Sequence, residues 1–474
     1  MALSHEDREL AFTPAHRLKE LIKQKNLSPV ELLEAIFRRI EEINPKIDAY
    51  LTLAQEQAYE AAHKAERAVI AGNNLGPLHG IPVSIKDLKE TKGIRTTYGS
   101  TVLRHNIPQS EGPLMKRLRE AGAIIIGKTN TPECGLTAPT ENNLAVTRNP
   151  WNTERSPGGS SGGAGAAVAA GISPLAEGSD GGGAIRIPSA LCGVFGLKAT
   201  NGRVPLDVHD WGISPVSCYG PITRNVRDAA MMLNVIAGPD KSDYTCIRTP
   251  APDYLKALDS KMGTLRIAWS LDMGYGMPVD SEVATAFKSA VKVFDSLGHR
   301  LEEAAPKTAK PFETWSYVYL GLCYQAYGFL FDHLDEITDY ARANMELARN
   351  FKGTDVNKAW MEVERIRGAV LDFFEEYDLL LTPVTTNPAL KIGAYEKKLE
   401  LGQVQKGFFS PYPLLPVFNL SRNPAASIPC GFSSEGLPIG LQIVGRLQDE
   451  VTVLQASAAF EQARPWADKY PPVS

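Results

Sequence analysis

A segment rich in glycine and serine, residues 158–186, carries the residue types best suited to chemistry. It holds ten of the 40 glycines of the chain. Ser160 and Ser161 each lie in a G-x-S-x-G frame, the pattern of a strand–turn–helix that presents a nucleophilic serine. Such a serine also needs a base and donors for a developing oxyanion, and the glycine run 181–183 offers backbone N–H groups without side chains. The pattern favours acyl-transfer chemistry.

Two other interpretations of this segment are weaker. A flexible linker would be polar throughout, whereas 164–170 is alanine-rich and helix-prone and 172–176 has the pattern of a buried strand. The run 163–168 begins like the nucleotide-binding pattern GxGxxG, but valine occupies the third glycine position and no Walker lysine follows. Neither interpretation displaces acyl transfer.

The elements around the segment predict an α/β fold, because apolar runs typical of doubly covered strands alternate with helical patterns. Strands are expected at 81–85, 123–127, 264–269, 378–382 and 439–444. Helices are expected at 29–43, 53–71, 113–122, 280–296, 312–330, 355–376 and 449–463. A capping box at Ser28 and Glu31 starts the first helix, which should end near Asn44 and Pro45. No linker divides the chain, so one large domain over 1–474 is expected.

The composition excludes several classes of protein. Fifty Lys and Arg against 54 Asp and Glu give a net charge of −4, which argues against an electrostatic binder of nucleic acid or of a membrane surface. The six cysteines form no CxxC pair and the eight histidines no HExxH motif, so no metal or other cofactor is expected. The chain shows no signal peptide and no run of about 18 apolar residues. A cytoplasmic enzyme acting on a small molecule is expected.

Five short motifs stand out along the chain: GIPVSIKD (80–87), GGSSGG (158–163), GSDGGGAIRIP (178–188), GVFGLK (193–198) and NPAASIP (423–429). In order and spacing they resemble the motifs of the amidase signature family, over about residues 10–463. The resemblance implies the amidase signature fold, a large central mixed β-sheet covered by helices on both faces. It also implies three regions of a single amidase domain, namely N-terminal helices at 1–72, a catalytic core at about 73–240 and a substrate-covering region at about 300–410.

The resemblance further implies hydrolysis of amides, and of some esters and carbamates, by two serines and a lysine in place of Ser–His–Asp. The lysine matches Lys86, and the bridging serine, which follows a cis peptide bond in the family, matches Ser160. The nucleophile position matches Ala184. In such a mechanism burial must lower the pKa of the lysine by roughly 2–3 units, so that the neutral amine acts as the base.

The remaining family positions surround these three. The backbone amides of Gly181, Gly182 and Gly183 match the oxyanion-binding run. Ser161 is expected to hydrogen bond with the lysine, and Asp180 and Arg186 are expected to form a pair that braces the loop. Cys134 and Cys192 are expected to be small buried hydrophobes. His79 and His209 would be needed for a Ser–His alternative, but no motif links either to Ser160.

Ala184 departs from the family, whose members have serine at this position. A methyl group cannot attack a carbonyl, so the chain as written should be nearly inert. Either it is a natural pseudoenzyme, or serine has been replaced by alanine to trap substrate. The second interpretation is favoured, because every other matched site position follows the family pattern and a pseudoenzyme would be expected to have drifted elsewhere too.

The substrate is less well defined by the sequence. The middle stretch, at about 300–410, carries no family motif, and its segment 312–331 is rich in aromatic residues, among them Trp315, Tyr317, Tyr319, Tyr324, Tyr327, Phe329 and Phe331. Some of these are expected to line a pocket for a hydrophobic or aromatic amide, anilide or carbamate. A non-catalytic pseudo-amidase and a glutamyl-tRNA amidotransferase A-like component stay open as alternatives. The sequence also leaves homodimerisation open.

Overall fold

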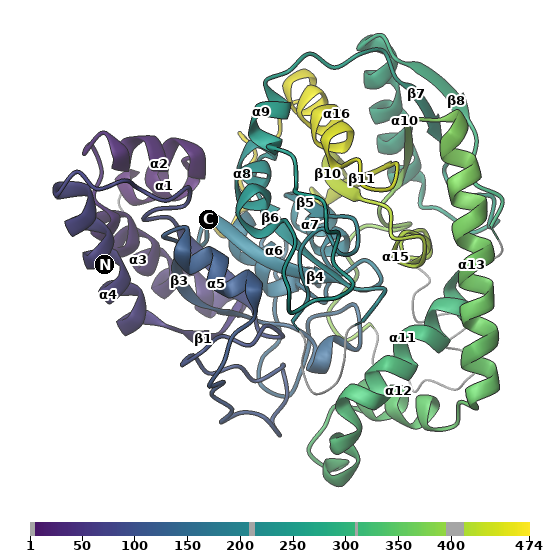
Figure 1. Ribbon diagram of the computed structural model, residues 1–474, viewed down its shortest axis with the longest axis horizontal. Coiled ribbons are helices and arrows are strands. Elements are labelled where there is room, and N and C mark those ends of the chain that lie inside the picture. The colour runs from purple at the N-terminus through teal and green to yellow at the C-terminus, as the bar shows by residue number, and fades with distance from the viewer. Residues whose placement is uncertain (1–4, 208–213, 309–310, 395–411) are drawn as a thin grey trace.

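One mixed β-sheet runs through the computed structural model, which describes residues 5–207, 214–308, 311–394 and 412–474. Its eleven described strands lie in the order β1-β3-β2-β4-β6-β5-β10-β11-β9-β7-β8 (Figure 1). They are β1 (Tyr50–Leu53), β2 (Pro82–Lys86), β3 (Ile124–Thr129), β4 (Leu175–Asp180), β5 (Phe195–Lys198), β6 (Cys218–Thr223), β7 (Arg266–Trp269), β8 (Arg300–Glu303), β9 (Leu379–Pro383), β10 (Ala425–Phe432) and β11 (Pro438–Gly445). Strand β2 is parallel to β3 and β4, β7 is parallel to β8 and β9, and the other neighbours are antiparallel.

Helices cover this sheet and extend beyond it. They are α1 (His5–Phe12), α2 (Ala15–Lys23), α3 (Pro29–Ile47), α4 (Gln55–Ile70), α5 (Pro113–Glu120), α6 (Gly162–Ala169), α7 (Arg186–Cys192), α8 (Val226–Ile236), α9 (Tyr254–Leu258), α10 (Ser281–Ser296), α11 (Pro311–Tyr327), α12 (Asp339–Arg349), α13 (Gly353–Glu376), α15 (Pro416–Leu420) and α16 (Glu450–Ala463). Two short 3₁₀ helices lie at Glu133–Gly135 and Gly328–His333. Helices α11, α12 and α13, drawn in green in Figure 1, form an arm at the edge of the molecule.

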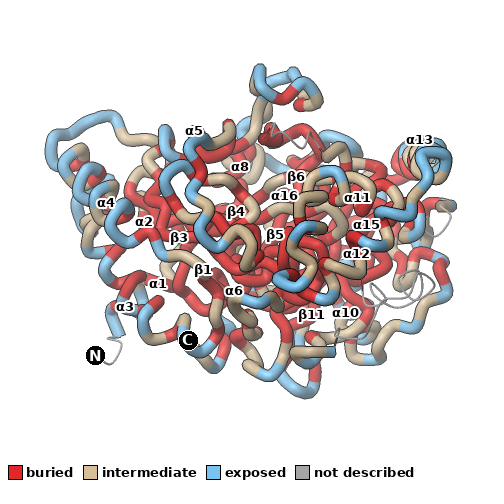
Figure 2. Tube along the Cα trace, turned by 90° about the horizontal axis from the view of Figure 1, so that it is seen from below, coloured by how far each residue is buried: buried red, intermediate tan, exposed pale blue. Residues whose placement is uncertain are grey.

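The two faces of the sheet can be told apart along β11. Alternate residues of a strand point to opposite faces, so Gly440 and Gly445 face opposite ways. A Cβ at Gly440 would collide with Ala190 of α7, and one at Gly445 would meet Val453 of α16. Helices α7 and α16 therefore cover opposite faces, and the buried residues gather along the strands between them (Figure 2). The predicted α/β architecture, with helices on both faces of a mixed sheet, is confirmed.

Most expected elements are present, with informative shifts. The capping box forms at Ser28 and Glu31, but α3 continues through Pro45 to Ile47 before Asp48 ends it in a left-handed conformation. The buried strand expected at 172–176 is β4, which begins at Leu175, and its polar residues up to Asp180 still pair with β6.

Candidate active site

Lys86 ends strand β2 with its amino group inside the molecule, where it is fully buried. Because β2 and β4 are parallel neighbours, their carboxyl ends meet at one edge of the sheet. This register brings Ser179 of β4 to the lysine, with 3.0 Å between Lys86 Nζ and Ser179 Oγ. On another side Nζ lies 2.7 Å from Ser160 Oγ. The lysine is thus held against two hydroxyl groups and away from water.

Burial lowers the pKa of Lys86 from its ordinary value to about 7. The buried carboxyl groups of Glu177 and Asp180 oppose this shift without cancelling it. Glu177 also fixes the end of the strand, because its Oε2 accepts the backbone N–H of Lys86 at 3.1 Å. The amine is therefore neutral in a substantial fraction of molecules at neutral pH, as a general base requires.

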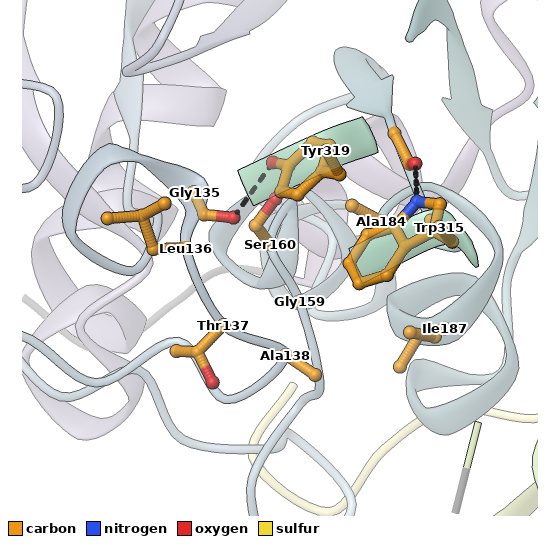
Figure 3. Close-up of a pocket in the computed structure, with 12 residues that line it drawn as sticks. Gly135, Leu136, Thr137, Ala138, Gly159, Ser160, Ala184, Ile187, Trp315 and Tyr319 are labelled. Carbon is orange, nitrogen blue, oxygen red and sulfur yellow. Dashed lines mark hydrogen bonds between the residues drawn. The ribbon is translucent and has the colours of Figure 1, made fainter. Parts of the chain in front are cut away.

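Ser160 follows a cis peptide bond from Gly159, in agreement with the expectation. The chain passes so close to Ala138 here that a Cβ at Gly159 would collide with the Ala138 carbonyl, so only glycine fits. Ser160 lines the same pocket as Ala184 (Figure 3). Its hydroxyl thus joins the buried lysine to the pocket that holds position 184.

Ser161 was expected to hydrogen bond with Lys86, but the hydroxyl that contacts the lysine beside that of Ser160 belongs to Ser179. The Ser161 hydroxyl donates to the carbonyl of Ser179 at 3.2 Å and accepts its backbone N–H at 3.3 Å, while the Ser179 hydroxyl contacts Lys86. Ser161 therefore supports the residue that touches the lysine. Ser179 was not among the expected site residues, although it lies inside the 178–188 motif. Its position near the end of a strand parallel to β2 is the feature that could have indicated its contact with Lys86.

The loop after β4 is fixed by Asp180. Its carboxylate accepts the backbone N–H of Gly183 at 2.7 Å and that of Ile185 at 3.2 Å. The Gly183 amide, expected to face an oxyanion, is therefore already bonded. Among the described residues, no protein group accepts a hydrogen bond from the N–H of Gly181 or of Gly182, and both glycines line the pocket with Ala184.

Asp180 and Arg186 form the expected pair, and both side chains are fully buried. Arg186 donates to both carboxylate oxygens of Asp180 at 2.9 Å, and Asn419 donates to one of them at 2.9 Å. Burial alone would raise the pKa of Asp180, but the charge and hydrogen bonds of Arg186, together with Lys198 and Asn419, outweigh it and hold that pKa well below its usual range. The carboxylate therefore stays ionised and organises the loop.

Asp180→Asn is expected to destabilise the protein by about 3–5 kcal/mol, because it leaves the Arg186 charge buried without its partner. Denaturant unfolding would measure the loss as a lower free energy of unfolding with an unchanged m value. The matched control is Glu362→Gln, which breaks the exposed pair with Arg365 and should cost less than about 1 kcal/mol. Equal losses in the two variants would contradict a special role for the buried pair.

Two pockets meet at Ser160, Gly181 and Tyr319. The smaller, of about 330 Å³, is drawn in Figure 3 and is lined by Gly135, Leu136, Thr137, Ala138, Gly159, Ser160, Gly181, Gly182, Ala184, Ile187, Trp315 and Tyr319. The larger has tyrosine and leucine walls, formed by Leu88, Tyr98, Leu206, Tyr219, Tyr319, Leu322 and Tyr327, with Cys134, Ser179, Asp207, Ser214, Ser217, Cys323 and Ala326 completing it.

The aromatic stretch 312–331 divides between pocket and core. Trp315, Tyr319 and Tyr327 line the pockets. The ring of Tyr317 packs on Phe351, and Phe312 packs against a separate cluster that includes Trp315. Tyr324, Phe329 and Phe331 pack against a hydrophobic cluster around Cys134.

The alternative nucleophile and base candidates lie in other environments. His79 Nε2 lies 3.0 Å from the carbonyl of Ala65, and His209 lies outside the described residues. Burial raises the pKa of the Cys134 and Cys192 thiols, so neither is a ready thiolate. In the described part of the chain, no cluster of three or more His, Cys, Asp or Glu is arranged to hold a metal ion, and no helix is long and apolar enough to cross a membrane.

Comparison with known proteins agrees with this geometry. A family model described as Amidase matches residues 31–454. An acylamidase of Rhodococcus erythropolis is 38% identical over 477 residues, covering 98% of each chain. A glutamyl-tRNA(Gln) amidotransferase component of Moorella thermoacetica is 37% identical over 492 residues, covering 98% of this chain and 99% of that one.

Solved structures agree in fold over almost the whole length. A 6-aminohexanoate cyclic dimer hydrolase complexed with substrate has a TM-score of 0.90 at 30% identity, covering 98% of this chain and 99% of that one. A bacterial aryl acylamidase of the amidase signature family has a TM-score of 0.89 at 29% identity, covering 96% of this chain and 97% of that one. With the family model matched from residue 31 to 454, this chain belongs to the amidase family, the amidase signature hydrolases.

Proposed function

We propose that this chain is a hydrolase of carboxylic acid amides built on Lys86, Ser160 and a serine at position 184, and that Ala184 stops it before the acyl-enzyme forms. The observation that carries the proposal is the 2.7 Å contact between the buried amine of Lys86 and Ser160 Oγ, in the pocket that also holds Ala184. The amine supplies a base and Ser160 supplies a hydroxyl relay. Position 184 lacks the attacking oxygen.

The proton path follows from these contacts once serine occupies position 184. Neutral Lys86 takes the proton of Ser160, which takes that of the attacking serine as its oxygen bonds to the amide carbon. The carbonyl oxygen becomes an oxyanion, which the N–H groups of Gly181 and Gly182 stabilise. The protonated lysine then returns the proton through Ser160 to the leaving nitrogen, because an amide nitrogen leaves poorly unprotonated. Water hydrolyses the acyl-enzyme and frees the acid.

In the Ala184→Ser protein, kcat/KM should rise with pH through about 7 and stay high into the alkaline range. The sign follows from the base, because neutral Lys86 is the competent form and its pKa, lowered by burial, is about 7. A pH–rate profile with an uncharged substrate measures this. An activity that falls as pH rises from 7 to 9 would contradict a lysine base.

The pocket walls support hydrophobic or aromatic amides, anilides or carbamates as substrates. Seven of the sixteen residues that line the larger pocket are tyrosine or leucine, and Trp315 and Ile187 face the smaller one. Relatives named acylamidase and aryl acylamidase point the same way. An amidotransferase component would instead act on a small polar amide together with partner chains, and the similarity to the glutamyl-tRNA(Gln) amidotransferase component keeps that alternative in view.

The test is the purified Ala184→Ser chain, without added proteins, on a panel of anilides, aliphatic amides, carbamates and glutamine. Hydrophobic anilides are expected to exceed acetamide and glutamine in kcat/KM by about tenfold or more, the discrimination that apolar pocket contacts provide. Preference for glutamine would favour the amidotransferase alternative. No turnover of any member would favour a pseudo-amidase.

A further inference from the structure

Trp315 of α11 reaches the glycine loop from a region that carries no family motif. Its indole N–H donates to the carbonyl of Gly181 at 2.6 Å (Figure 3). The side chain is only 2% exposed, so this bond forms away from bulk water. The arm formed by α11, α12 and α13 is thereby tied directly to the loop that follows β4.

This bond fixes a peptide plane. The only cis peptide bond in the described residues is Gly159–Ser160, so the bond between Gly181 and Gly182 is trans. In a trans peptide the C=O and N–H point in opposite directions. Holding the Gly181 carbonyl toward Trp315 therefore directs the Gly182 N–H away from the indole. The preceding peptide is held in the same manner, because Asn419 Nδ2 donates to the Asp180 carbonyl at 3.0 Å.

The indole also packs closely against the loop and has little freedom to move. A Cβ at Gly182 would lie 2.5 Å from Trp315 Cζ2, so only glycine allows this approach. Tyr319 stacks on the indole, with 4.7 Å between ring centroids and 12° between ring planes. The Tyr319 hydroxyl in turn donates to the Gly135 carbonyl at 3.3 Å. The ring that holds the peptide is thus itself held.

We propose that Trp315 is a positioning residue for amide hydrolysis, which holds the Gly181–Gly182 peptide so that the Gly182 N–H faces the developing oxyanion. The inference rests on the proposed function for its catalytic consequence. Its structural part, the orientation of one peptide by one indole, stands on the contacts alone. Trp315 acts through the loop and bonds to no reacting atom.

Trp315→Phe tests the proposal, because it removes the N–H and keeps an aromatic ring against the loop. In the Ala184→Ser background kcat should fall by about 10–100-fold, less than the loss from deleting an oxyanion donor outright, with KM changed less than about threefold. The matched control is Trp466→Phe, which removes an indole N–H that donates to the Arg224 carbonyl at 2.8 Å, and it should leave kcat within about twofold.

Two further measurements separate positioning from binding and from the proposed function. In the Ala184 chain, which is expected to bind amides without cleaving them, Trp315→Phe should change the Kd of an anilide less than about threefold. Crystal structures of the Ala184 chain with and without Trp315→Phe should show a reoriented Gly181–Gly182 peptide. An unmoved peptide, an unchanged kcat, or a Kd that rises as much as kcat/KM falls would each overturn the proposal. If Ala184→Ser itself is inert, the proposed function and the catalytic part of this inference fail, and the crystal structures still decide whether Trp315 orients the peptide.

Discussion

Ala184→Ser is expected to raise kcat for amide hydrolysis by about 10⁵–10⁶-fold, because removing one member of a catalytic unit disables nearly the whole unit. The other members of the proposed unit lie in or beside the pocket that Ala184 lines. Lys86 and Ser160 are in contact, and Asp180 holds the loop that carries the alanine. One oxygen is the group that the proposed attack lacks.

The measurement is single-turnover and steady-state hydrolysis by the Ala184 and Ala184→Ser proteins prepared side by side. A matched control adds the same hydroxyl elsewhere in the same pocket. Ala138→Ser does this, since Ala138 also lines the smaller pocket and is 3% exposed. It should give no turnover, because its hydroxyl does not take the family nucleophile position. Activity in the control equal to that of Ala184→Ser would remove the assignment of position 184, and inactivity of both on every amide would favour a pseudoenzyme.

The sequence predicts some parts of this site well, and Lys86 shows why. It directly follows the largely apolar strand predicted at 81–85, inside a family motif, and a lysine that ends a strand covered on both faces is expected to be buried with it. The predicted strand and the predicted burial are both present. The Asp180 and Arg186 pair was predictable for a similar reason, because two opposite charges beside a glycine run imply a braced loop.

Other parts depend on contacts between distant segments. Strand β4 was expected to start earlier, and its end carries Glu177, Ser179 and Asp180, which hydrophobic periodicity alone would assign to a loop. These residues pair with β6 as part of the strand, and their polar groups find partners in β2, in Ser161 just before α6, and in α15. No local pattern contains that information, so the role of Ser179 was missed.

The aromatic stretch shows the same limit for specificity. Trp315 and Tyr319 are one helical turn apart and could have belonged to a core stripe or to a pocket. The outcome depends on which side of α11 meets the glycine loop, and that is set by tertiary packing against α13 and α15. The periodicity of apolar residues identifies which face of a helix is buried, but it does not identify the segment that packs against that face.

Lys86→Ala, made in the Ala184→Ser background, is expected to lower kcat by about 10⁴-fold or more, because it removes the only base that contacts Ser160 in the described part of the site. Individual replacement of His79 or His209 should change kcat/KM by less than about tenfold, or roughly 1.4 kcal/mol. The contact of His79 with the Ala65 carbonyl explains the small effect expected there. A loss at either histidine equal to that at Lys86 would reopen a Ser–His mechanism.

A base and a structural lysine would respond differently to added amine. Lys86→Ala leaves a space beside Ser160 and Ser179 into which a small primary amine can bind, and a bound amine can accept the proton that Lys86 accepts. Hydrolysis by Lys86→Ala should therefore recover in part with added methylamine or ethylamine, and the recovered rate should rise with pH as the added amine deprotonates. Lys198→Ala is the matched control, because Lys198 is also fully buried with a pKa lowered by burial to about 8, yet it bonds to Asn201 and the Asn423 carbonyl instead of the serines. Lys198→Ala should lower the stability of the protein, and added amine should not raise the hydrolysis rate of this variant. The role of Lys86 as the proton acceptor would be contradicted if added amine failed to raise the hydrolysis rate of a folded Lys86→Ala protein. An equal increase in both variants would contradict it as well.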